Sequence, residues 1–186
     1  MQIMQFILKQ IKQLIVGELA TNCYLLVSGE EMAVIDPGGD AERILEEITS
    51  SGAKIKYIIN THYHPDHTLA NEKISEKTGA EILIHQAEKD FINFKASRFL
   101  KEDDEIKIGE ISLEVIHTPG HTKGSICLTG EDFIFTGDTL FKDGQGRTDL
   151  PGGSAEEIEE SLEKLKKLFK PGILIYPGHG DIFKIK

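Results

Sequence analysis

The chain has 186 residues, 39% hydrophobic and 28% charged, which is the composition of a globular protein long enough for one well-buried core. Acidic residues outnumber basic ones by 31 to 21, and the net charge of −10 disfavours nucleic acid and anionic membranes as partners. The apolar N-terminal stretch is short and is broken by Lys9 and Lys12, which argues against a secretion signal. Cys23 and Cys127 sit in apolar runs and are predicted to be buried thiols. We therefore expect a single cytoplasmic domain spanning residues 1–186.

The first half of the chain is predicted to be a meander followed by alternating strands and helices. Apolar runs bounded by turn residues predict strands at residues 5–16, 21–28, 32–36, 56–60 and 81–85. Apolar residues at helical spacing predict helices at residues 41–51 and 66–78.

The second half repeats this order. Short strands are predicted at residues 105–108, 111–117, 125–129 and 132–136, and a last strand at 173–176. Helix 155–168 begins with the capping-box pattern of Ser154 and Glu157. Two similar halves of this kind predict an α+β fold with two sheets packed face to face and helices outside.

The segment 61–67, with the sequence THYHPDH, carries the strongest chemical signal. His62 and His64 alternate along an extended segment and can face one point, whereas Asp66 and His67 project from the start of the next helix. Imidazole and carboxylate groups are ligands for Zn²⁺, Fe²⁺ or Mn²⁺. One loop therefore offers two clusters of metal ligands.

Three further candidate ligands follow later strands of the chain. His121 comes after a Pro-Gly turn, Asp138 follows Gly137 at a strand end, and His179 is flanked by glycines. The two remaining histidines, His85 and His117, are interpreted as structural.

This set of motifs resembles that of the metallo-β-lactamase superfamily, over nearly the whole chain from Asn22 to Gly180. Three segments are more similar still to its glyoxalase II (hydroxyacylglutathione hydrolase) branch, namely TPGHTKGS at 118–125, TGDTLF at 136–141 and GRTD at 146–149. The resemblance implies a four-layer αββα sandwich, in agreement with the two halves described above.

The resemblance also implies a role for each candidate ligand. The first metal is expected on His62, His64 and His121, and the second on Asp66, His67 and His179, with Asp138 bridging the two. Two divalent ions, most readily Zn²⁺ although Fe or Mn also suits these ligands, would generate a bridging hydroxide that attacks a carbonyl. Asp66 would in addition orient that water, and Asp36 would hydrogen-bond to a ligand histidine.

Some features separate this chain from other members of the family it resembles. Asp138 stands near the position where the secreted β-lactam-cleaving enzymes use a cysteine, which disfavours antibiotic hydrolysis. The helical domain that follows this fold in full-length glyoxalase II is expected to be absent. Arg147 matches a residue contacting the thiol part of the substrate, and a surface ion pair with Asp143 or Asp149 is the alternative for it.

The leading hypothesis is a dinuclear metal-dependent hydrolase of small thioesters. The alternatives are a mononuclear iron persulfide dioxygenase, which shares the GRTD motif, a lactonase of the same fold, and a non-catalytic metal-binding module. Residues 178–181 read GHGD, whereas the dioxygenases have AHDY there, and this favours the hydrolase.

Overall fold

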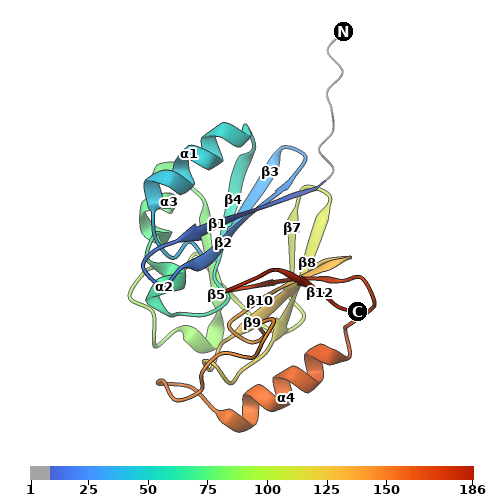
Figure 1. Cartoon of the computed structure of the whole chain (residues 1–186). Coiled ribbons are helices and arrows are strands. Elements are labelled where there is room, and N and C mark those ends of the chain that lie inside the picture. Colours follow the sequence, from blue (N-terminus) through green and yellow to red (C-terminus); the bar gives the residue numbers. More distant parts are fainter. Residues whose placement is uncertain (1–8) are drawn as a thin grey trace.

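The computed structural model describes residues 9–186, which form two six-stranded sheets packed face to face, with helices on their outer faces (Figure 1). This is the predicted α+β architecture, a four-layer αββα sandwich. The expected N-terminal strand is present from Gln10 onward, whereas residues 5–8 of that prediction lie outside the described residues.

The first sheet has strand order β1-β2-β3-β4-β5-β6. The meander of β1 to β3 is antiparallel, and the later strands pair in parallel through helical crossovers. Its strands are β1 (Gln10–Val16), β2 (Thr21–Ser28), β3 (Glu31–Ile35), β4 (Lys54–Ile59), β5 (Glu81–His85) and β6 (Arg98–Leu100). The helical elements of this half are α1 (Ala41–Ser51), α2 (Pro65–Thr68), α3 (Asn71–Thr78) and the 3₁₀ turn η1 (Gln86–Glu88).

The second sheet has strand order β12-β11-β10-β9-β8-β7. Only β10 and β11 pair in parallel, and α4 (Ala155–Lys166) lies between them in sequence and covers the outer face. Its strands are β7 (Glu105–Ile108), β8 (Ile111–His117), β9 (Ile126–Thr129), β10 (Phe133–Gly137), β11 (Leu174–Pro177) and β12 (Phe183–Lys184).

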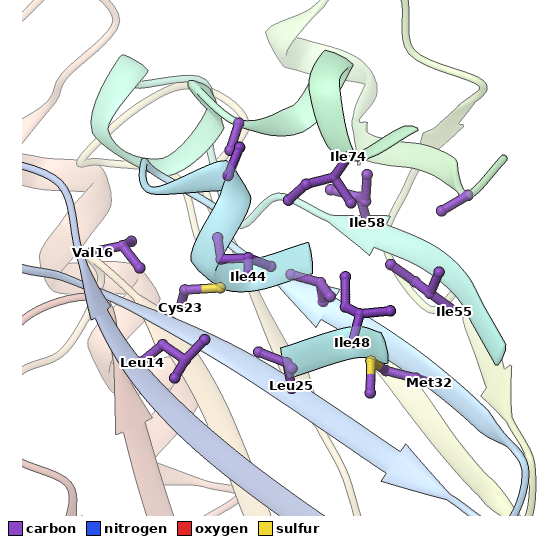
Figure 2. Packing of buried hydrophobic residues seen from close by; sticks show 14 of the residues in the cluster. Leu14, Val16, Cys23, Leu25, Met32, Ile44, Ile48, Ile55, Ile58 and Ile74 are labelled. Atoms are coloured by element: carbon purple, nitrogen blue, oxygen red, sulfur yellow. The ribbon is translucent and has the colours of Figure 1, made fainter. Parts of the chain in front are cut away.

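Strand β2 shows how the layers are held together, because every one of its residues is buried. Cys23 and Leu25 face α1 and α3 in the core shown in Figure 2. Tyr24 and Leu26 face the second sheet in the core between the two sheets. A strand buried on both faces needs a continuous apolar run, which is the pattern in the sequence.

The structure differs from the sequence prediction after the first motif. The helix expected over 66–78 is two helices, α2 and α3, broken at Leu69 and Ala70. The backbone N–H of Ala70 donates to the carbonyl of Pro37 instead of continuing the helical ladder. The side-chain amides of Asn60 and Asn71 bond to each other and fix the start of α3. A neighbouring loop therefore decides where the helix breaks.

Smaller differences are also found at other element ends. The three-residue strand β6 and the two-residue strand β12 carry no clear pattern of their own, and α4 ends at Lys166 rather than at 168. Cys23 and Cys127 are free and buried, as predicted. Among residues 9–186, no helix is both long enough and apolar enough to cross a membrane.

Candidate metal centre

The loop after β4 holds its ligands through a short turn. Pro65 begins α2, and the backbone N–H of His67 donates to the carbonyl of His64 at 2.9 Å. The side-chain amide of Asn60 donates to the carbonyl of His67 at 2.9 Å. The extended backbone at His64 and the helical backbone from Pro65 direct successive side chains of the motif to different places.

The first cluster contains His62, His64 and His121, whose ligand atoms all lie within 4.8 Å of one another. Nε2 of His121 lies 2.9 Å from Nδ1 of His64. The ring of His62 lies nearly perpendicular to the other two rings, with centroids 4.8 and 4.7 Å away. Residues from the first sheet and from the loop between β8 and β9 thus meet at one point.

The second cluster contains Asp66, His67 and His179, also within 4.8 Å of one another. Nε2 of His179 lies 3.2 Å from Oδ2 of Asp66 and 3.3 Å from Nε2 of His67. His179 follows β11 of the second sheet, so this cluster too draws on both sheets.

Asp138 lies between the two clusters, directly after β10. Its Oδ1 is 3.4 Å from Nε2 of His67, and its Oδ2 is 3.5 Å from Nε2 of His121 and 3.7 Å from Nε2 of His179. Each cluster can therefore share this carboxylate, which is the arrangement that a bridging ligand requires. The structure brings together all seven side chains that the motifs nominated.

The polar atoms in these clusters fit a divalent metal. Nε2 of His62 and Oδ1 of Asp138 are buried and have no hydrogen-bond partner among residues 9–186, which is costly unless a cation occupies the space. Pairs of imidazole nitrogens also face one another at close range, as expected around a shared cation. A Cβ added at Gly178 would lie 2.2 Å from Oδ1 of Asp138, so the glycine keeps this space open.

Asp36, directly after β3, holds the loop that carries the ligands through hydrogen bonds to Thr61. Its Oδ1 accepts the backbone N–H of Thr61 at 2.7 Å, and its Oδ2 accepts the Thr61 hydroxyl at 2.7 Å. The same Oδ2 lies 3.1 Å from Nδ1 of His67, and the Thr61 hydroxyl lies 3.1 Å from Nδ1 of His62. One carboxylate thus fixes a histidine in each cluster, with Nε2 left facing the metal position.

Several further residues shape the site but belong to none of the motifs in the sequence. The Thr21 hydroxyl donates to Oδ2 of Asp66 at 3.2 Å. Asn22 and Tyr24, on the same strand, donate to the carbonyl of Pro177 at 2.9 and 2.6 Å and hold the loop that carries His179. No local pattern identifies them, because their partners lie more than 40 residues away in sequence.

The charge environment differs between His62 of the first cluster and His67 of the second, both of which are fully buried. Burial, followed by repulsion from His67 and His121, holds the pKa of His62 well below its ordinary value. Burial also acts to lower the pKa of His67, but Asp138 and Asp36 outweigh it and raise that pKa to about 9. Neutral imidazole is the metal-binding form, and the lowered pKa of His62 favours that form.

Arg147 contributes to the site in a way that the sequence did not indicate. Its backbone carbonyl accepts a hydrogen bond from Nδ1 of His121 at 2.7 Å and fixes the ring. Its guanidinium is exposed and forms a two-pronged ion pair with Asp149, with both contacts at 2.7 Å. The surface ion pair considered for this residue is therefore present.

The two histidines interpreted as structural lie together outside the clusters. The rings of His85 and His117 stack with centroids 4.1 Å apart. Nδ1 of His85 accepts the backbone N–H of Ala87 and caps η1, and Nε2 of His117 bonds to the carbonyl of Lys123.

The family model for the metallo-beta-lactamase superfamily matches residues 16–179, and the chain belongs to this superfamily. The matched region contains β2 to β11 and all seven clustered side chains.

Individual relatives agree with this assignment. The chain is 32% identical to the probable metallo-hydrolase YqgX of Bacillus subtilis, in an alignment that covers 89% of this chain and 87% of the relative. Among solved structures it is similar to the BLEG-1 B3 metallo-beta-lactamase, with a TM-score of 0.89, 27% identity and 94% of each chain covered. It is also similar to TTHA1623 in a di-iron-bound form, with a TM-score of 0.84, 27% identity and 93% and 94% coverage.

Proposed function

We propose that this protein is a dinuclear metal-dependent hydrolase of small thioesters, similar to glyoxalase II. The observation that carries the proposal is the position of Asp138, with one oxygen toward His67 and the other toward His121 and His179. A carboxylate placed in this way suits two cations rather than one.

In this proposal, different residues of the chain bind the metal ions and position the water. Two divalent ions, most readily zinc, would supply a water of lowered pKa and polarise the substrate carbonyl. His62, His64 and His121 would hold the first ion, and Asp66, His67 and His179 would hold the second. Asp66 also accepts a hydrogen bond from the Thr21 hydroxyl at 3.2 Å, which would help to orient its carboxylate for a role in positioning that water.

The proposed substrate contact is weak. The Arg147 guanidinium is exposed and already paired with Asp149, so its contact with a substrate carboxylate would contribute little to affinity. We therefore expect a high KM for S-lactoylglutathione and tolerance of other thioesters. The proposal includes a cytoplasmic location, with which the free, buried Cys23 and Cys127 agree.

Elemental analysis of the natively purified protein, paired with a substrate panel, tests the proposal. The panel contains S-lactoylglutathione, a simple thioester, a lactone, a β-lactam and glutathione persulfide with an oxygen electrode. We expect close to two metal ions per chain and turnover of the thioesters. Oxygen uptake on the persulfide without thioester turnover would assign the protein to the dioxygenases, and turnover of the lactone or the β-lactam alone would also reject the proposal.

The role of Arg147 is tested separately with Arg147→Ala. Because the contact is remote from the carbonyl, it acts equally on ground and transition states, so KM for S-lactoylglutathione should rise several-fold while kcat stays nearly unchanged. The matched control is Lys166→Ala on α4, which removes an exposed cation paired with Glu163 and should leave KM unchanged. An unaltered KM in Arg147→Ala would remove this residue from the substrate site.

A further inference from the structure

Glu88 is a buried acidic residue that belongs to neither metal cluster. It is the last residue of η1, in the first half of the chain, and it is fully buried. Its Oε2 has no hydrogen-bond partner among residues 9–186. Burial raises the pKa of Glu88, and the Thr122 hydroxyl and the backbone N–H groups of Gly124 and Tyr63 oppose this effect. A carboxyl group is costly at such a position, so its contacts indicate what it does.

Those contacts lie in the loop that carries His121. Oε1 of Glu88 accepts the Thr122 hydroxyl at 2.6 Å and the backbone N–H of Gly124 at 2.5 Å. A Cβ added at Gly124 would lie 2.5 Å from Cγ and Oε1 of Glu88. Only glycine at this position lets the carboxyl group approach the backbone so closely.

The same segment also contacts the loop that carries His62 and His64. The backbone N–H of Phe91 donates to the carbonyl of Glu88 at 2.9 Å. The ring of Phe91 stacks on Tyr63, with centroids 5.0 Å apart and an interplanar angle of 30°. Tyr63 lies between the two histidines in sequence, and its ring is 4.6 Å from that of His64.

The first cluster needs such a connection because its ligands come from different sheets. His62 and His64 follow β4 of the first sheet, whereas His121 belongs to the second half of the chain. Small changes in the relative position of the two loops would separate His121 from His64.

We propose that Glu88 is a positioning residue that holds the His121 loop against the His62–His64 loop and so sets the zinc affinity of the first cluster. The inference rests on the metal centre of the proposed function but not on the thioester substrate. In this role the important feature of Glu88 is Oε1, which accepts two hydrogen bonds, and not the negative charge of the carboxylate.

Zinc titration of the metal-free full-length protein, in competition with a chelator, tests this role. Glu88→Met removes the acceptor at similar length and should weaken zinc binding about 10- to 100-fold, as other supporting residues of metal ligands do. Glu88→Gln keeps an oxygen for both donors and should stay within about threefold of the wild type.

A second background separates positioning from general destabilisation. When His121→Ala has already removed a ligand of the first cluster, adding Glu88→Met should not weaken the remaining zinc binding any further. The matched control is Glu31→Met. Glu31 also accepts a glycine N–H from the other sheet, that of Gly109 at 2.8 Å, and its loss should leave zinc affinity unchanged.

Three outcomes would overturn the inference: unchanged zinc affinity in Glu88→Met, equal losses in Glu88→Gln and Glu88→Met, or an equal loss in the His121→Ala background. If Glu88→Met does not fold, Thr122→Val removes one of the two donors from the opposite side, and it should weaken zinc binding several-fold. Unchanged affinity in that variant would count equally against the inference. A missing thioesterase activity with these zinc affinities intact would count only against the proposed function.

Discussion

Asp138 lies close to histidines of both metal clusters, which sets it apart from the histidines around it: its Oδ1 is near His67, and its Oδ2 is near His121 and His179. A shared carboxylate also lowers the repulsion between two cations. We therefore expect Asp138→Ala to lose both metal ions more readily than His64→Ala, which removes a ligand of one cluster. Elemental analysis after gel filtration in metal-free buffer measures this, and two retained ions in Asp138→Ala would exclude the bridging role.

His85 provides a pH-dependent contribution to stability that is independent of the metal ligands. Burial, and then repulsion from His117, lowers its pKa to about 4, against about 6.5 in the unfolded chain. Between these values the unfolded chain binds more protons, so the stabilisation present above pH 6.5 is lost as the pH falls toward 4.

The variant that tests this is His85→Asn, whose side-chain oxygen can still accept the N–H of Ala87 and cap η1. Urea unfolding of the metal-free proteins at pH 7 and pH 5 should show that the wild type loses about 2 kcal/mol more than the variant does. Equal losses would mean that His85 does not titrate in this range.

At the scale of elements, the site is a set of strand ends brought to one edge of each sheet. The loops after β4, β8, β10 and β11 carry the ligands, and each loop is held by a residue of the opposite sheet or of a neighbouring loop. The carbonyl of Thr61, for example, accepts the N–H of Ile126 at 2.9 Å. Rigid strands with close backbone contacts therefore fix the position of side chains that lie in loops.

The loop after β11 gives a test at this scale. Gly178→Ala should place a methyl group 2.2 Å from Oδ1 of Asp138 and 2.8 Å from Cε1 of His67, so metal content should fall strongly. Gly180→Ala in the same loop meets open space but has a φ of 76°, so it should cost about 1 kcal/mol of stability without loss of metal. Metal analysis and urea unfolding of both variants distinguish the effects, and full metal content in Gly178→Ala would contradict the arrangement.

At the scale of the whole molecule, the metal centre lies at the seam between the two halves. Besides Asp138 there are six candidate ligands. Four of them, His62, His64, Asp66 and His67, follow β4 in the first half of the chain, and the other two, His121 and His179, belong to the second half. Metal binding should therefore stabilise both sheets together, because unfolding either half dismantles both clusters.

Thermal unfolding with and without zinc measures this coupling. Free zinc at about 100 times its Kd adds about 2.7 kcal/mol per occupied site to the free energy of unfolding. For a chain of this length, each occupied site should therefore raise Tm by roughly 5–10 °C. The shift should depend on zinc concentration and should be much smaller in Asp138→Ala. A wild-type Tm that does not respond to zinc would show that the folded protein does not bind the ion more tightly than the unfolded chain does.

The sequence by itself determined the elements whose signal is local. Helix α1 and the start of α4 follow from apolar spacing and from the Ser154 cap, and β2 follows from a continuous apolar run. The ligands could also be nominated, because an HxHxDH motif and single His or Asp residues after strands are visible without a structure.

Only the tertiary structure decided how these pieces support one another. The break between α2 and α3 depends on Pro37 and Asn60, and the orientation of His121 depends on the backbone carbonyl of Arg147. The burial of Glu88 against Thr122 joins residues 34 positions apart. Local periodicity and turn chemistry act over a few residues, whereas these contacts form only when the two sheets pack, so no spacing in the sequence records them.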